Sequence, residues 1–213
     1  MGWTSYHRDK HAESDRDHFA AKFDDHYRII AHGTASSVFY AAVRDTRTGE
    51  VFAYIALMRW SREAYNFAYK DFTETSHPCY YQAPKAVLNA LTPTDDEEAN
   101  VWRERCHRHH AQRDYLRRHM KPGMKVRLSR TVTFEGGDRS DTFTYRQLGK
   151  GTRGFLVLGR SRCQIPNWRD YVYALIHPDH GPVLTPVGKD QAKQQNRAPR
   201  HADAPTQPTS PRA

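Results

Sequence analysis

The feature that most constrains the fold is a capped and strongly basic helix predicted between Thr94 and Met120. Thr94 and Glu97 have the spacing of a capping box, and acidic side chains fill the first turn, where the helix dipole favours negative charge. Steps of three and four residues then place one seam of side chains on a single face. This seam consists of Trp102, Cys106, His109, Arg113, Leu116 and Met120. We expect the helix to end before Pro122-Gly123, because these residues stop helices.

Positive charge is concentrated on this helix and just after it. The chain has 33 Lys and Arg against 24 Asp and Glu, a net charge of +9. Between residues 103 and 130, ten basic residues stand against two acidic ones, a local net charge of +8. Such a concentration of charge points to a polyanionic partner, DNA or RNA. The side chains predicted to contact nucleic acid are Arg103, Arg105, Arg108, Arg113, Arg117, Arg118, Lys121, Lys125, Arg127 and Arg130. The alternative is a solvated helix face whose Arg stems cover apolar neighbours.

A small sheet is predicted before the helix. Segments rich in β-branched and aromatic residues lie at 27–32, 37–43 and 51–60. Turn residues at 45–49 predict a hairpin, a loop follows residue 60, and Pro84 begins a short helix over 85–91. Phe19 and Phe23, four residues apart, predict another short helix in the polar first 25 residues. We therefore predict an α+β domain with a basic C-terminal helix over residues 1–120.

Short strands are predicted after the helix, at 125–128, 131–134, 142–148, 155–158 and 171–176. Gly-rich turns separate them, and five short strands indicate a small antiparallel β-barrel-like module over residues 121–178. The stretch 186–213 is rich in Pro, Gln and Ala and is predicted to be a disordered tail. The fold class is thus α+β: a mixed sheet-and-helix domain, a long basic helix, a barrel-like module and a tail.

The composition narrows the cellular setting and the class of protein. The three cysteines are widely spaced and odd in number, which argues against a disulfide scaffold and favours a reducing cytoplasm. Charged residues interrupt any apolar core of a signal peptide, and no apolar run reaches the ~20 residues that span a bilayer. No cofactor motif or catalytic signature is present, so we predict no cofactor, no catalytic residues and no membrane partner, and lean against an enzyme.

Short motifs follow one another in a characteristic order along the chain. They are Gly2-Trp3-Thr4-Ser5, Tyr69-Lys70-Asp71 with Glu74, Pro78-Cys79, Pro84, Leu91-Thr92-Pro93-Thr94, Ala99-Asn100, Trp102-Arg103-Glu104-Arg105-Cys106, Lys121-Pro122-Gly123 and Ile165-Pro166-Asn167-Trp168-Arg169. This layout resembles an uncharacterised protein family encoded by bacteriophages, plasmids and integrative elements. The resemblance covers roughly residues 1–176 and is most specific over 69–106. It implies an origin in a mobile genetic element and no assigned activity.

Two further groups of side chains could form a metal site or a catalytic site. Helical spacing would put Cys106 and His109 or His110 on one face, where they could bind zinc. No Cys-x-x-Cys partner is present, so we favour a basic face that includes these residues with His107 and His119, and we predict no metal site. Asp71 and Glu74, with Lys70 and His77 nearby, could serve Mg²⁺-dependent phosphodiester cleavage, but that chemistry needs more convergent carboxylates. We favour a loop whose carboxylates cap amides or pair with Lys and Arg.

Rings and cations alternate near the end of the last predicted strands. Trp168, Tyr171 and Tyr173 lie close in sequence to Arg160, Arg162 and Arg169. Such a surface can stack bases of single-stranded nucleic acid, although the same rings suit the core of a barrel, which we favour for Trp168. We expect a non-catalytic accessory protein of a mobile element that binds nucleic acid through its basic helix and the barrel-like module. The alternative is a protein–protein interaction module, such as an inhibitor of host defence, and a metal-dependent nuclease comes last.

Overall fold

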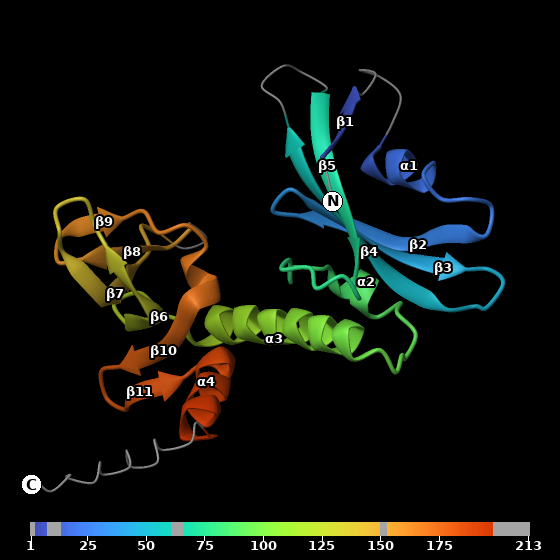
Figure 1. Cartoon of the computed structure of the whole chain (residues 1–213). Coiled ribbons are helices and arrows are strands. Elements are labelled where there is room, and N and C mark those ends of the chain that lie inside the picture. Colours follow the sequence, from blue (N-terminus) through green and yellow to red (C-terminus); the bar gives the residue numbers. More distant parts are fainter. Residues whose placement is uncertain (1–2, 8–13, 61–65, 150–152, 198–213) are drawn as a thin grey trace, which may run out of the picture. The chain divides into compact units, whose positions relative to one another are not determined.

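Two compact units, Met1–Ala111 and Gln112–Ala213, make up the protein in the computed structural model (Figure 1). The structure describes residues 3–7, 14–60, 66–149 and 153–197. The boundary between the units falls within the long helix α3 (Glu97–His119). Helix α3 therefore contributes its beginning to the core of the first unit and its end to the core of the second.

The first unit contains a five-stranded antiparallel sheet in the order β1-β5-β4-β3-β2. Its strands are β1 (Thr4–His7), β2 (Tyr27–Ala35), β3 (Val38–Asp45), β4 (Val51–Trp60) and β5 (Asn66–Thr73). The strands predicted at 27–32, 37–43 and 51–60 are confirmed. The prediction of a loop after residue 60 is wrong for Asn66–Thr73, because these residues form strand β5, which pairs with both β4 and β1. The strand contains three aromatic residues, Phe67, Tyr69 and Phe72, a residue type that favours strands.

Helices cover both faces of this sheet (Figure 1). Strands β3 and β4 are buried almost throughout, which explains their nearly continuous apolar sequence. One face packs against α2 (Lys85–Leu88) and the start of α3, where Trp102 and Cys106 are buried. The other face packs against Phe19 of α1 (Asp15–Ala20). Helix α2 is shorter than the predicted 85–91.

The start of α3 differs from the predicted capping box. Asp96 caps the helix, since its Oδ1 accepts the backbone N–H of Ala99 at 2.7 Å. Thr94 instead accepts the N–H of Asp96, so the helix begins two positions later than a Thr94 cap implies. The predicted seam is wrong at one position, because Gln112 is buried and Arg113 is exposed.

The second unit contains a six-stranded antiparallel sheet in the order β11-β10-β6-β7-β8-β9. Its strands are β6 (Lys125–Thr133), β7 (Arg139–Arg146), β8 (Phe155–Leu158), β9 (Ser161–Cys163), β10 (Val172–His177) and β11 (Gly181–Leu184). The predicted strands 125–128 and 131–134 are one strand, β6, with an irregularity opposite β7. The described strands form an open order from β11 to β9 rather than a closed barrel.

The prediction of a disordered tail from residue 186 is wrong for Pro186–Arg197, which form helix α4. Thr185 is buried, and its hydroxyl accepts the N–H of Gly188 at 3.3 Å, which caps the start of this helix. Helix α4 contacts β10 and β11. The rest of the predicted tail, 198–213, lies outside the described residues. No described helix combines the length and the apolar character needed to cross a membrane.

Candidate nucleic-acid interface

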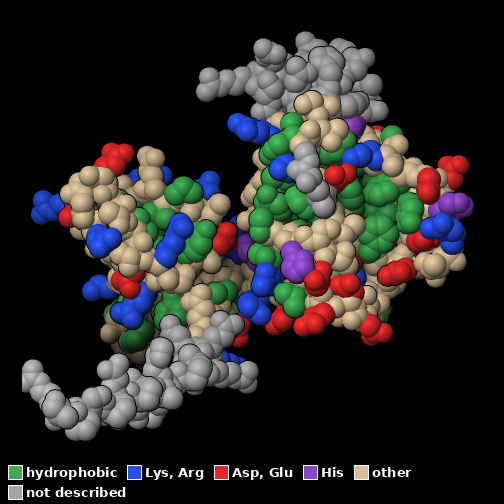
Figure 2. Space-filling view, viewed as in Figure 1, with side chains coloured by type: hydrophobic (Ala, Val, Ile, Leu, Met, Phe, Trp, Pro, Cys, Tyr) green, Lys and Arg blue, Asp and Glu red, His purple; other side chains and the backbone are tan. Residues whose placement is uncertain are grey.

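Net charge divides unequally between the two units. Residues 112–213 contain 19 Lys and Arg against eight Asp and Glu, a net charge of +11. Residues 1–111 contain 14 Lys and Arg against 16 Asp and Glu, a net charge of −2. Figure 2 shows Lys and Arg side chains spread over the second unit and acidic side chains gathered on the first. An interface for a polyanion is therefore to be sought in the second unit.

Strand register places basic side chains of the second unit on one sheet face. Along β6, Val126 and Leu128 are buried while Lys125 and Arg127 are exposed, so the two Lys and Arg side chains point away from the core. Lys125 lies opposite Thr144, and Arg127 lies opposite Thr142. Residues opposite each other in neighbouring strands share a face, and every second residue returns to it.

The same face continues across β7, β8 and β9. Arg146 follows Thr144 by two residues and is exposed, and it lies opposite Phe155. Arg162 lies opposite Val157, and its guanidinium carbon is 4.7 Å from the centre of the Phe155 ring. We call this surface the outer face; it comprises Lys125, Arg127, Thr142, Thr144, Arg146, Phe155, Val157 and Arg162.

The outer face offers cations that are only weakly neutralised. Arg127 Nε is 3.9 Å from Asp141 Oδ2, and both side chains are about half exposed. A surface pair of this kind contributes little, so Arg127 is available to an incoming phosphate. Arg146 and Arg162 form no ion pair with a described residue. Cations around a half-buried ring are the combination found on surfaces that bind nucleic-acid strands.

The other predicted contacts in the second unit are not among the residues of the outer face. Arg113, Arg117 and Lys121 are exposed, and Arg117 Nη2 pairs with Asp114 at 2.9 Å. Arg118 donates to the backbone carbonyl of Asp114. Arg130 stacks on Tyr171, with its guanidinium carbon 3.8 Å from the ring centre.

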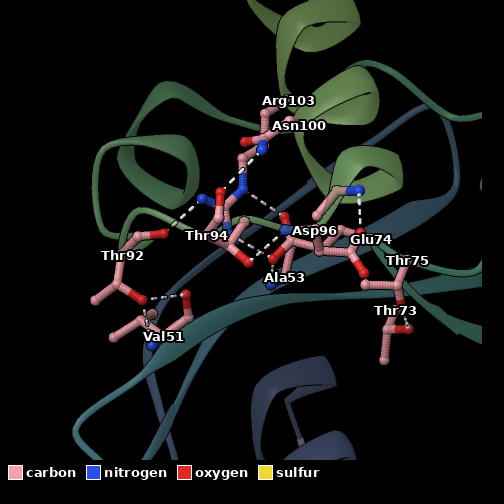
Figure 3. A network of polar contacts seen from close by, with 11 residues as sticks. Val51, Ala53, Thr73, Glu74, Thr75, Thr92, Thr94, Asp96, Asn100 and Arg103 are labelled. Atoms are coloured by element: carbon pink, nitrogen blue, oxygen red, sulfur yellow. Dashed lines mark hydrogen bonds and ion pairs between the residues drawn. The ribbon is translucent and has the colours of Figure 1, made fainter.

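Arg103 lies in the core of the first unit (Figure 3). Its Nε and Nη2 each donate to a Glu74 carboxylate oxygen at 2.7 Å, and its Nη1 donates to the carbonyl of Thr92. All three guanidinium nitrogens thus bind partners inside the protein. Arg103 is therefore not available to an external phosphate.

The remaining predicted contacts of the first unit already have partners. Arg105 donates to the hydroxyl of Tyr81 at 2.6 Å and lies over its ring. Arg108 pairs with Glu104 one helical turn away, at 2.7 Å. Both belong to the first unit, which has a negative net charge, and neither is part of the outer face.

The Cys and His side chains of α3 do not converge. Cys106 is fully buried, and burial raises the pKa of its thiol to about 12. His110 Nε2 lies 2.7 Å from the carbonyl of Ala83, and His119 Nδ1 lies 2.9 Å from that of Tyr115. His107 is exposed. Within the described ranges, no three His, Cys, Asp or Glu side chains form a group that could hold a metal ion.

Asp71 and Glu74 engage different partners on opposite faces of the first sheet. Asp71 Oδ2 accepts a hydrogen bond from Lys22 at 2.7 Å, on the face that carries Tyr54 and Tyr69. Glu74 reaches Arg103 on the other face. The convergence that two-metal chemistry requires is therefore absent from this pair. The alternative reading, in which these carboxylates pair with Lys and Arg and cap an amide, matches the structure, although Asp71 lies in a strand.

The rings near residue 170 belong mainly to the core of the second unit. Trp168 is 7% exposed and packs in the core, as favoured from the sequence, while Tyr171 and Tyr173 are half-buried. Sequence reasoning did not include Arg146 or Phe155 in the interface. Side chains alternate between the two sheet faces along 142–146 and 155–157. Once these strands are paired in register, the alternation places Arg146 and Phe155 on the same face.

Comparison with known proteins gives one family match. Residues 93–168 match a family described as a domain of unknown function (DUF6927). This segment contains α3, β6, β7, β8 and β9, and therefore the whole outer face. Neither the curated proteins nor the solved structures give a match.

Proposed function

We propose that the protein binds nucleic acid, DNA or RNA, and that the outer face of the second unit contacts the phosphate backbone. The observation that supports the proposal most is the placement of Lys125, Arg127, Arg146 and Arg162 on one sheet face, in a unit of net charge +11. Four cations on one face can each displace a counterion from a nucleic-acid strand, which makes binding sensitive to salt.

Neighbouring side chains on the outer face suit the same ligand. Thr144 of β7 lies opposite Lys125 of β6 and two residues before Arg146, and its hydroxyl can donate a hydrogen bond to a phosphate oxygen. The guanidinium of Arg162 lies over Phe155 and offers its other plane to a base. An accessory role in a mobile genetic element belongs to this proposal as well, and the gene neighbourhood tests that part.

Fluorescence anisotropy with labelled single- and double-stranded oligonucleotides, at several salt concentrations, tests the proposal. We compare the wild type with the double variant Arg127→Glu/Arg146→Glu. The matched control is Arg28→Glu/Arg44→Glu, which reverses two exposed Arg side chains in paired strands of the first unit.

We expect the outer-face variant to lose at least about tenfold in affinity at 0.1 M salt, with a log–log salt slope shallower by about two. The control should stay within about twofold of the wild type. Wild-type binding that is absent, or equal in both variants, would contradict the proposal. Salt-insensitive retention of a protein partner instead would favour the interaction-module alternative.

A further inference from the structure

A second cluster of cations in the same unit lies on the core side of the sheet. Arg169 belongs to the short 3₁₀ helix η1 (Trp168–Tyr171) and is half-buried. Its guanidinium carbon lies 4.3 Å from the centre of the Trp168 ring, and its Nη2 donates to the carbonyl of Gly154 at 3.3 Å. A ring contact and a hydrogen bond thus hold this cation in place.

Tight packing of Gly154 places the neighbouring residue Arg153 near Arg169. Gly154 is buried, and an added Cβ would collide with the ring and hydroxyl of Tyr145. Tyr145 in turn lies beside Trp168, with ring centres 6.0 Å apart. Because Arg153 directly precedes Gly154, the exposed Arg153 side chain begins next to the carbonyl that Arg169 binds.

Arg113 comes to the same place from helix α3. The preceding residue, Gln112, is buried, and its Nε2 donates to the carbonyl of Val172 at 2.8 Å, directly after η1. Burial lowers the pKa of Arg169, and repulsion from Arg113 and Arg153 lowers it further, while Tyr145 acts in the opposite direction. Arg113 and Arg153 therefore each lie close enough to Arg169 to repel its guanidinium. In the described ranges, none of the three pairs with a carboxylate.

We propose that Arg113, Arg153 and Arg169 form a binding site for a phosphate monoester, separate from the outer face. A dianionic phosphate would relieve the repulsion that acts on Arg169, and the guanidinium forks match its oxygens. Such a group occurs on a free nucleotide and on the phosphorylated end of a nucleic-acid strand. The site goes beyond the proposed backbone contacts, because it recognises a terminal group.

Calorimetric titration of the full chain tests the site with two matched pairs of probes. Adenosine 5′-monophosphate is compared with adenosine, and a 5′-phosphorylated oligonucleotide with its 5′-hydroxyl form. The variant is Arg113→Gln/Arg153→Gln, which keeps Arg169 and its packing and removes two exposed charges. The control is Arg139→Gln/Arg160→Gln, which removes two exposed charges elsewhere in the unit.

We expect the phosphate to improve binding at least about tenfold in one probe pair or both, and the Arg113/Arg153 variant to abolish that gain while the control keeps it. A gain with the nucleotide alone identifies a free nucleotide as the source, and a gain with the oligonucleotide alone identifies a strand end. No gain in either pair, or the same gain in the variant, overturns the site. The outer-face variant Arg127→Glu/Arg146→Glu should keep the gain, which separates this test from that of the proposed function.

Discussion

Arg103 and Glu74 form a bidentate ion pair in the core of the first unit, with both N–O distances at 2.7 Å. Their side chains are 14% and 3% exposed. Glu74 also accepts the backbone N–H of Ala53 in β4, and Arg103 donates to the carbonyl of Thr92 (Figure 3). The pair therefore joins β4, the end of β5, the loop before α3 and α3 itself.

Removing Arg103 should destabilise the first unit strongly. In Arg103→Ala, Glu74 is left buried without its partner, and we expect a loss of about 3–5 kcal/mol in the free energy of unfolding. Glu104→Ala, which removes the exposed pair with Arg108, should cost only about 0.3–0.5 kcal/mol. Urea denaturation measures both. Equal losses in the two variants would contradict the structural role of Arg103.

Asp45 should contribute to stability in a defined pH range. The side-chain hydrogen bonds from Arg47 lower the pKa of Asp45 from 3.8 to about 2. A lowered pKa in the folded state stabilises the protein above pH 3.8, and this contribution is lost as the pH falls towards 2. The melting temperature of Asp45→Asn should therefore lie below that of the wild type at pH 6, and the difference should shrink by pH 2. A difference that stays constant across this range would count against the ion pair.

Gly188 should be essential for the packing of helix α4. An added Cβ would collide with the backbone carbonyl of Tyr173, and backbone cannot move aside as a flexible side chain can. We expect Gly188→Ala to release α4 and to expose residues 186–197 to limited proteolysis. Gly136→Ala, where a Cβ meets open space, is the control. Equal cleavage of wild type and Gly188→Ala would indicate that α4 is not docked.

Much of the first sheet could be predicted, because β3 and β4 are long β-branched and aromatic runs bounded by turn residues. Other features depend on tertiary context. The β2–β3 turn has both Ser36 and Ser37 at positive φ, a geometry that sequence usually signals with Asn-Gly. Strand β5 is held between two partners that sequence alone does not pair. The sequence contains two signals for the start of helix α4, Thr185 as cap and Pro186 in the first turn. The polar composition of the segment nevertheless led to the prediction of a disordered tail.

The candidate interface could be located only in part. The local charge of residues 103–130 was correctly identified, but charge along a sequence does not reveal which cations are already used. Arg103 is buried against Glu74, a partner far away in sequence. Arg146 and Arg162 join Arg127 on one face only through the register of β7, β8 and β9. Counting charges therefore identifies the basic part of the chain, whereas strand pairing is needed to identify which cations share the outer face.

Cysteine reactivity offers a direct test of where α3 packs. Cys79 is exposed, whereas Cys106 is fully buried against the first sheet, and burial raises the pKa of its thiol to about 12. Only a thiolate attacks iodoacetamide, so we expect native protein at pH 8 to be alkylated first at Cys79. Cys163 is half-buried with a raised pKa and should follow slowly. Mass spectrometry of peptides after timed labelling measures each site, and Cys79→Ser should remove the fast phase. Labelling of Cys106 should require denaturant; alkylation of Cys106 as fast as Cys79 in the native protein would contradict the packing of α3 on this sheet.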